Sequence, residues 1–240
     1  GTHFDLNSLG GAEIARDKAY TAHFLAEAGF QVPRGVLVSA PRSVAATRIK
    51  NLPHADKMAG LEDAVSFAET AGFPLFVKPN DAREGQDVLR VTSLYQLETA
   101  LTDLFLRHDN VLVQEAVPGR DLRILVLKDE VLCVIERWVP DVVGDGEQCV
   151  EDLLQALPGR TRSDQRILAE LFSQGLSLKS VPVEGQRICL LPNANLSAGG
   201  IGRIVTGELC DALKAIAISS GQTLGLTYYG VDMLAVDPSD

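Results

Sequence analysis

The stretch Phe73–Asp87 reads FPLFVKPNDAREGQD and is the most informative part of the chain. Its first half is an apolar run of strand length that carries a lysine, Lys78, at its far end. A bare ammonium group in a protein interior is costly, so we expect Lys78 to face an anion where the strand ends. The small and polar residues that follow have backbone N–H groups that can help to hold a phosphate. The alternative is a lysine that extends from an edge strand into solvent.

A second informative stretch, Val111–Arg123, reads VLVQEAVPGRDLR. A strand that runs into Gln-Glu-Ala-Val and then into a Pro-Gly turn can form a hinge. Backbone N–H and C=O groups at such a hinge can bind the edge of an adenine. Asp121 lies just beyond the turn, where its carboxylate can accept hydrogen bonds from ribose hydroxyls.

Helices and strands alternate in the first half of the chain, and longer strands dominate the second half. Helical spacing or capping residues predict helices from Asp17 to Gly29, from Leu61 to Gly72, behind Ser93 and Gln96, from Ser163, and from Leu209 to Gly221. Strands are predicted at 36–38, 75–78, 111–113 and 228–236, with a hairpin at 122–127 and 131–135. This order predicts an α+β fold with two lobes.

The two lobes are expected to meet where a strand ends in the sequence Val117-Pro118-Gly119. We therefore expect a lead-in segment over residues 1–16, an N-terminal lobe over 17–117 and a C-terminal lobe over 118–240.

Composition narrows the class of protein. The 240 residues carry 22 Lys+Arg against 32 Asp+Glu, a formal net charge of −10, and 46% of them are hydrophobic. Such a balance is that of a globular chain, and its acidity argues against nucleic-acid and membrane-surface partners, which usually need a basic face. The sequence holds no apolar run of the roughly 20 residues that a membrane span needs. Four scattered cysteines are typical of buried thiols in a reducing, cytoplasmic setting.

Several common catalytic motifs are missing from the sequence. It contains no G-x-x-x-x-G-K-[ST], no G-x-G-x-x-G after a strand, no H-E-x-x-H and no G-x-S-x-G. The four histidines are isolated from one another and are expected at or near the surface. These absences disfavour hydride transfer on a Rossmann fold, zinc hydrolysis and serine-triad chemistry.

Taken in chain order, the two informative stretches resemble the ATP-grasp superfamily, which joins a carboxylate to an amine or thiol by way of an acyl phosphate. The resemblance runs from about residue 17 to the end. Within the superfamily the second half is most similar to the cyanophycin synthetase and glutathione-type branch. The resembling segments are Gly119–Arg123, Arg137–Pro140, Val143–Gly146, Glu151–Leu154, Asn195–Gly200 and Tyr229–Asp232. The resemblance implies an ATP-grasp fold with the nucleotide between two α+β lobes.

The resemblance also implies nucleotide-binding residues in the first lobe. Lys78 would bind the α- and β-phosphates, with Lys18 as a second phosphate-binding lysine and Gly85 as the flexible point of the loop. The adenine and ribose would meet the Gln114 side chain, the Glu115 carbonyl, the Val117 N–H and the Asp121 carboxylate.

In the second lobe the resemblance implies substrate and metal sites. Asp232 would be the first carboxylate ligand of Mg²⁺, and Arg137 would steady the acyl phosphate and the tetrahedral intermediate. Arg123 and the Asn195–Gly200 segment would face the carboxylate substrate, with Asn195, Gly199 and Gly200 as its contacts. The alternatives are an ordinary salt-bridged arginine at Arg123 and a strand-end aspartate at Asp232.

The chain departs from the family pattern in two places. The phosphate loop of the family usually has glycines where this chain has Ala82 and Asp87, and a carboxylate there would repel a triphosphate unless a cation intervenes. The family also follows its first metal carboxylate with a strand that bears Glu-x-Asn, and the sequence reaches Asp240 before such a motif. We therefore expect an incomplete metal site and little ligase activity from this stretch alone.

Together these residues predict the ATP-binding domain of an ATP-dependent carboxylate–amine ligase that uses ATP and Mg²⁺ on amino acid or peptide substrates. One alternative is an ATP-grasp module that binds nucleotide without complete catalysis, and a more distant one is an acidic structural protein without a ligand. The sequence does not name the substrates and leaves a homo-oligomer open.

Overall fold

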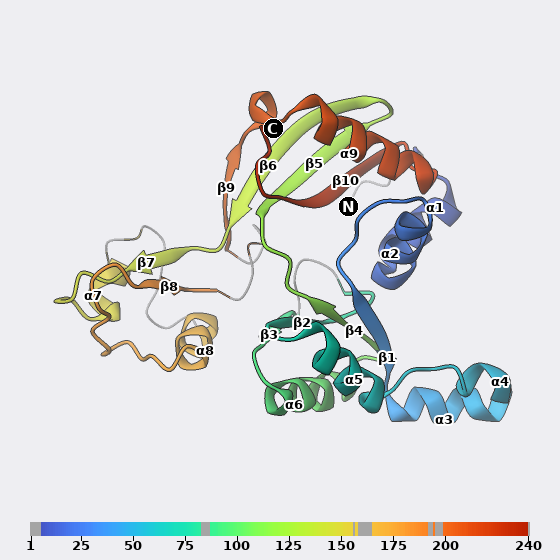
Figure 1. The fold of residues 1–240 in the computed structure, drawn as a ribbon, viewed down its shortest axis with the longest axis horizontal. Coiled ribbons are helices and arrows are strands. Elements are labelled where there is room, and N and C mark those ends of the chain that lie inside the picture. Colours follow the sequence, from blue (N-terminus) through green and yellow to red (C-terminus); the bar gives the residue numbers. More distant parts are fainter. Residues whose placement is uncertain are drawn as a thin grey trace. The chain divides into compact units, whose positions relative to one another are not determined.

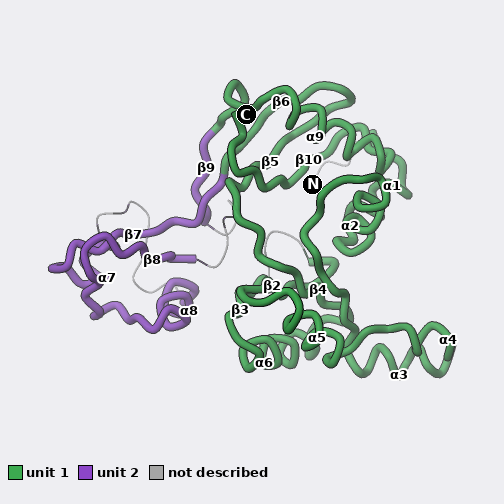
Figure 2. Tube along the Cα trace, in the orientation of Figure 1, with its two compact units in different colours: residues 1–136, 204–240 green, residues 137–203 purple. Residues whose placement is uncertain are grey.

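A computed structural model gives the structure of residues 6–82, 87–155, 157, 165–191, 194 and 199–239. The chain divides into two compact units (Figure 2). Unit 1 consists of residues 1–136 and 204–240, and unit 2 consists of residues 137–203. Helices and antiparallel strands are both present, so the predicted α+β class is confirmed.

The first sheet of unit 1 has the strand order β1-β4-β2-β3. Its strands are β1 (Gly35–Ser39), β2 (Leu75–Pro79), β3 (Leu89–Val91) and β4 (Asn110–Glu115), and neighbouring strands are antiparallel. Helices α5 (Leu61–Ala71) and α6 (Leu94–Phe105) pack on one face of this sheet (Figure 1). Alternate strand residues, among them Leu75, Val77, Val111 and Val113, are fully buried in the core between the sheet and these helices.

Four helices of unit 1 lie outside that core, and the sequence predicted only one of them. They are α1 (Leu9–Arg16), α2 (Lys18–Glu27), α3 (Pro41–Lys50) and α4 (Leu52–Ala55). Helix α1 lies within the expected lead-in segment, and the Ser8 hydroxyl caps it by accepting the N–H of Gly11. Asn7 attaches this region to the start of β10, since its Oδ1 accepts the N–H groups of Thr227 and Tyr228.

The second sheet has the strand order β10-β5-β6-β9. Its strands are β5 (Arg120–Leu127), β6 (Glu130–Trp138), β9 (Ile201–Ile204) and β10 (Tyr228–Ala235). A short 3-10 helix (Thr206–Glu208) and helix α9 (Asp211–Thr223) complete this part of the chain, and α9 lies along the sheet in Figure 1. The predicted hairpin and final strand are confirmed.

Gly221 does not end α9, as the sequence predicted, but lies inside it. A Cβ at this position would come within 1.9 Å of the Tyr229 ring. The glycine therefore serves close packing of the helix on β10 rather than termination of the helix.

Unit 2 has a small core of its own. Strands β7 (Asp141–Val143) and β8 (Arg187–Cys189) pair antiparallel, and helices α7 (Val150–Gln155) and α8 (Gln165–Ser173) pack against them. The predicted helix start at Ser163 lies outside the described residues.

Two further sequence predictions concern the whole chain. The four cysteines form no disulfide with one another, but Cys189 is exposed and the other three are half-buried, so the expectation of buried thiols was wrong. In the described residues, no helix has the length and apolar character that would let it cross a bilayer.

Candidate functional site

Lys78 lies on the face of the first sheet that points away from α5 and α6. Strand alternation sends Leu75 and Val77 into the core and leaves Lys78 on the opposite face. Its Nζ donates a hydrogen bond of 2.7 Å to Oε1 of Gln114, which lies on the neighbouring strand β4. The lysine is thus neither bare in the core nor extended into solvent, and two of the predicted site residues are in direct contact.

Burial lowers the pKa of Lys78 to about 8. The positive charge of Lys18 contributes to this lowering of the Lys78 pKa, and the negative charge of Asp232 opposes it. A desolvated ammonium group beside a second cation gains stability from a bound anion. The electrostatics of this end of β2 therefore favour an anionic ligand.

Lys18 holds the turn that follows β2. Asp17 caps α2 by accepting the N–H of Tyr20, so Lys18 begins the helix. Its Nζ donates to the carbonyl oxygens of Pro79 (3.0 Å), Asn80 (2.9 Å) and Ala82 (2.7 Å). Burial lowers the pKa of Lys18 as well, against the opposing charges of Asp81 and Asp17. An anion bound here would compete with these carbonyls for the three protons of the ammonium group.

Asn80 was not singled out from the sequence, yet it is one of the few buried polar residues that the structure describes. Its Oδ1 accepts the N–H of Ala19 at 3.0 Å, and its own N–H donates to the carbonyl of Asn110 at 3.1 Å. Its position directly after Lys78-Pro79 was the only available signal.

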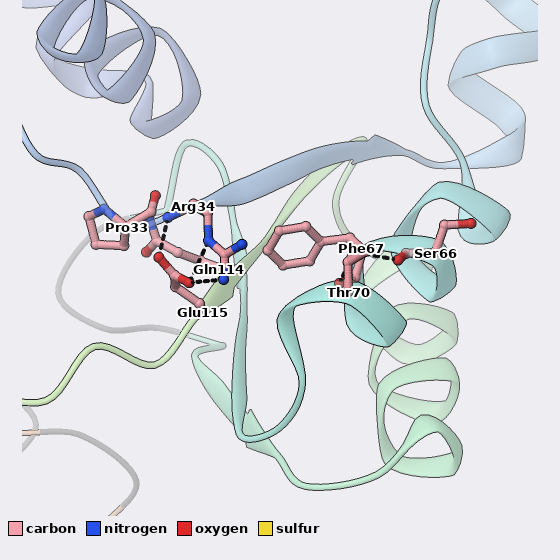
Figure 3. A network of polar contacts seen from close by, with 7 residues as sticks. All are labelled: Pro33, Arg34, Ser66, Phe67, Thr70, Gln114 and Glu115. Atoms are coloured by element: carbon pink, nitrogen blue, oxygen red, sulfur yellow. Dashed lines mark hydrogen bonds and ion pairs between the residues drawn. The ribbon is translucent and has the colours of Figure 1, made fainter.

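The predicted hinge lies at the end of β4, next to the start of β1 (Figure 3). Arg34 donates to Glu115 twice at 2.8 Å, from its backbone N–H to Oε1 and from Nε to Oε2, and this contact lowers the pKa of Glu115. The Nε2 of Gln114 donates to the Pro33 carbonyl at 3.4 Å. Val117 follows with 38% of its surface exposed. The side chain of Glu115 therefore fixes the hinge, and its carbonyl remains a predicted adenine contact.

Three predicted residues share one face of the second sheet. Leu122, Ile124 and Val126 of β5 are fully buried, so Asp121 and Arg123 lie on the other face. Asp232 of β10 is directly opposite Arg123 in the register, and Arg123 Nη1 donates to its Oδ2 at 2.8 Å. The guanidinium group passes over Gly230, where a Cβ would come within 2.6 Å of it.

The described residues fit a magnesium ion only in part. They contain no group of three or more His, Cys, Asp or Glu side chains that could hold a metal. Mg²⁺ at phosphoryl-transfer sites is bound by one or two carboxylates together with water and phosphate oxygens. Asp232 fits the role of one such carboxylate, because its side chain is 56% exposed and already pairs with a cation.

Asp87 was expected to repel a triphosphate unless a metal or a lysine intervenes, and the structure places an arginine beside it. Its carboxylate accepts from Arg107 Nη1 at 2.7 Å on both oxygens and lies 2.8 Å from His108 Nε2. The hydrogen bond from Arg107 is the main reason that the pKa of Asp87 is lowered. Arg107 supplies a cationic partner beside Asp87 and His108 a further polar contact, and sequence reasoning identified neither.

The structure brings some of the predicted site residues together and not others. Lys78 contacts Gln114, Lys18 binds the carbonyl of Pro79 at the end of β2, and the charges of Lys18 and Asp232 act on Lys78. Arg137, Gly199 and Gly200 belong to unit 2. Gly85 and Asn195 lie outside the described residues. The roles of all these residues stay predictions.

Comparison with known proteins gives concordant results. The family model described as "D-ala D-ala ligase C-terminus" matches residues 46–145. The cyanophycin synthetase of Geminocystis herdmanii is 30% identical over 95% of this chain and 26% of its own length. The glutathione biosynthesis bifunctional protein GshAB of Enterococcus faecalis is 29% identical over 93% of this chain and 29% of its own length.

The chain belongs to the ATP-grasp superfamily. The ATP-grasp fold that the sequence predicted is confirmed by solved structures. The D-alanine–D-alanine ligase of Bacillus anthracis superimposes with a TM-score of 0.59 at 14% identity over 97% of this chain and 56% of the ligase. The same ligase solved with ATP superimposes with a TM-score of 0.56 at 16% identity over 97% of this chain and 54% of the ligase. The chain spans about a quarter of the length of its cyanophycin synthetase relatives.

Proposed function

We propose that this chain is the ATP-binding part of an ATP-dependent ligase that joins a carboxylate to an amine through an acyl phosphate. The observation that carries the proposal is the arrangement at the end of β2. Two amino groups with lowered pKa values, those of Lys18 and Lys78, are close enough for the charge of Lys18 to act on Lys78. Lys78 also contacts the Gln114 side chain, and Asp232 acts electrostatically on it. The relatives with similar sequences are named as a cyanophycin synthetase and a glutathione biosynthesis protein, and the Bacillus anthracis D-alanine–D-alanine ligase has been solved with ATP.

The phosphates and the adenine would bind at opposite ends of this arrangement. Lys78 would bind the α- and β-phosphates, and Lys18 would exchange a carbonyl contact for a further phosphate oxygen. Gln114 would turn from Lys78 toward the adenine, joined by the Glu115 carbonyl and the Val117 N–H. The Arg34–Glu115 contact supports this role, because it holds the end of β4 in place for backbone recognition.

The proposed reaction has two steps. An oxygen of the substrate carboxylate attacks the γ-phosphorus of ATP, and the bond from that phosphorus to the β–γ bridging oxygen breaks, so ADP leaves and an acyl phosphate forms. The amine nitrogen then attacks the acyl carbon and loses a proton, and inorganic phosphate leaves. Catalysis of phosphoryl transfer is mainly positioning and charge neutralisation, which are the tasks that lysine and arginine side chains perform.

The remaining proposed roles concern the substrate and the metal. Arg123 and the Asn195–Gly200 segment would hold the carboxylate substrate, and Arg137 would steady the acyl phosphate. Asp232 would supply a carboxylate ligand to Mg²⁺, which when bound neutralises charge on the β- and γ-phosphates. Arg123 would have to release Asp232 for this purpose, since the two side chains are paired.

A nucleotide-binding module without complete catalysis is the second candidate. It is favoured by the lack of a three-ligand metal cluster among the described residues. The two candidates differ in phosphate release by the protein that carries this chain. The ligase releases inorganic phosphate from ATP only when amino acid or peptide substrates are present, whereas the module binds ATP without such release.

ATP binding itself is tested by thermal unfolding. A ligand that binds only the folded state stabilises it by about 2.7 kcal/mol at 100 times its dissociation constant. Millimolar Mg²⁺-ATP is therefore expected to raise the melting temperature of the protein by several degrees, and ADP or a non-hydrolysable analogue should act similarly. GTP serves as the control for adenine recognition. Unchanged melting with every adenine nucleotide would contradict both candidates.

ATP affinity is expected to fall as the pH rises above about 8. The pKa of Lys78 is about 8 in the free protein, and phosphate oxygens nearby will raise it, so binding takes up a proton above pH 8. Affinity then declines by up to about tenfold per pH unit until the pH reaches the pKa of the bound form. Calorimetric titrations from pH 7 to 9.5 measure this decline. The Lys78→Arg variant keeps its positive charge over this pH range, so its ATP affinity should decline less steeply. An ATP affinity that does not change with pH in the unmodified protein would refute the assignment of Lys78 to phosphate binding.

A further inference from the structure

Asn80 caps the start of helix α2 from a distant part of the chain. Its Oδ1 accepts the backbone N–H of Ala19 at 3.0 Å, and its carbonyl accepts the backbone N–H of Lys18 at 3.4 Å. These are two of the first N–H groups of α2, which have no acceptor within the helix. Asp17, the residue before the helix, accepts a third N–H, that of Tyr20. A residue 61 positions away from Ala19 therefore completes the cap that Asp17 begins.

The same residue is fixed on its other side to the first sheet. Asn80 follows the last residue of β2, and its N–H donates at 3.1 Å to the carbonyl of Asn110, the first residue of β4. Only 5% of the surface of Asn80 is exposed. Buried polar groups are costly to leave without hydrogen bonds, so these contacts hold the residue in one orientation. Asn80 thus connects the start of α2 to the end of β2 and the start of β4.

The residue that this connection holds most directly is Lys18. Its backbone N–H and its Nζ both donate to the Asn80 carbonyl, and its Nζ also donates to the carbonyls of Pro79 and Ala82. A lysine ammonium group is carried on a flexible four-carbon stem, so its position depends on the backbone beneath it and on its acceptors. The charge of Lys18 also acts on Lys78. The placement of Lys18 therefore affects both ammonium groups of the candidate site.

We propose that Asn80 is a positioning residue for ATP, which holds the start of α2 on the end of β2 and thereby places the Lys18 ammonium group for a phosphate oxygen. The inference rests on the proposed function, in which Lys18 exchanges a carbonyl contact for a phosphate oxygen. Asn80 acts through Lys18 and does not need to touch the nucleotide. An ammonium group that is in place before ATP arrives loses less conformational entropy on binding, so the connection raises ATP affinity.

A double-mutant cycle distinguishes this role from a general effect on folding. Asn80→Ala removes the side-chain acceptor of Ala19 and is expected to weaken ATP binding about fivefold, whereas Lys18→Met is expected to weaken it about tenfold. If Asn80 acts through Lys18, the double variant binds ATP as the Lys18→Met variant does. Independent effects would instead multiply to about fiftyfold and would overturn the inference. Isothermal titration of the four proteins with ATP at pH 7 measures the cycle.

The matched control is Asn51, which caps another helix of unit 1. Its Oδ1 accepts the N–H of His54 at 3.2 Å at the start of α4. Asn51→Ala loses a cap of the same kind, so it should leave ATP affinity unchanged even where it lowers stability. Equal losses of ATP affinity in Asn51→Ala and Asn80→Ala would overturn the positioning role. Asn80→Ser, which has a shorter side chain, takes the place of Asn80→Ala in the cycle if Asn80→Ala does not fold.

Chemical labelling of Lys18 in the nucleotide-free protein gives a second measurement. Acetic anhydride acetylates lysine amino groups, and mass spectrometry measures the rate at each lysine. Loss of the connection should make Lys18 react several-fold faster in Asn80→Ala than in the unmodified protein, with Lys214 on α9 as the internal reference. Asn51→Ala should leave the ratio of the two rates unchanged.

The outcomes separate this inference from the proposed function. If the unmodified protein does not bind ATP, the proposed function fails, and the rate of Lys18 acetylation still decides whether Asn80 places the lysine. If Lys18 reacts at the same rate in Asn80→Ala and in the unmodified protein, the positioning role is overturned whether or not ATP binds. Faster acetylation of Lys18 together with non-additive losses of ATP affinity supports the inference.

Discussion

Replacing Lys78 with methionine is expected to weaken ATP binding by about ten- to a hundredfold. A hydrogen bond to a charged group contributes about 1.5–3 kcal/mol, and the ammonium group of Lys78 is already desolvated before the nucleotide arrives. Methionine fills a similar volume on the same face of β2 but cannot bind phosphate. Isothermal titration of both proteins with ATP at pH 7 measures the difference.

The Lys78→Met variant should lose ATP affinity without losing folding stability. Burial disfavours the charged form of Lys78 in the folded state, so removal of the charge relieves a cost rather than adding one. The matched control is Lys214→Met, which removes a lysine from an ion pair with Asp211 on α9 and should leave ATP affinity unchanged. Equal ATP affinity of Lys78→Met and the unmodified protein would show that Lys78 has a structural role only.

The parts of the site that could be predicted from sequence are those that depend on local pattern. The apolar run before Lys78 predicted β2, and the Asp17 cap predicted the helix that begins at Lys18. Both lysines carry their signal within a few residues of their own position. The contact between Lys78 and Gln114 could not be predicted from local pattern alone, because it requires the antiparallel pairing of β2 with β4.

The parts that could not be predicted depend on contacts between residues far apart in the sequence. The contacts of Asp87 could not be predicted from its neighbours in the sequence, because Arg107 and His108 come 20 and 21 residues later. Gly221 appeared to end α9 because glycine commonly ends helices, and only the Tyr229 ring against it explains its place inside the helix. In both examples the residue type indicated a special position, and tertiary contacts determined what that position does.

The ion pair of Asp232 with Arg123 also joins residues far apart in the sequence. A test of the metal site must separate the loss of this ion pair from the loss of a metal ligand. Asp232→Asn removes the proposed carboxylate ligand, whereas Arg123→Gln keeps that carboxylate and removes its ion-pair partner, which is also a proposed substrate-binding residue. If Asp232 matters only through the ion pair, the two variants should behave alike. If it binds Mg²⁺, they should differ in the concentration of Mg²⁺ that half-saturates ATP-dependent phosphate release.

Asp232→Asn is expected to lower substrate-dependent phosphate release from ATP by more than a hundredfold in the protein that carries this chain. Charge neutralisation by a bound metal contributes several kcal/mol to a phosphoryl-transfer transition state, and each 1.36 kcal/mol corresponds to a tenfold change in rate. ATP binding without metal should change little, because Asp232 contributes a negative charge near Lys78 that does not help to hold phosphate. Arg123→Gln frees the carboxylate and should leave the Mg²⁺ requirement unchanged or lower it, even where the substrate KM rises. If the Mg²⁺ requirement increases equally in both variants, Asp232 acts through its ion pair with Arg123 and does not bind the metal.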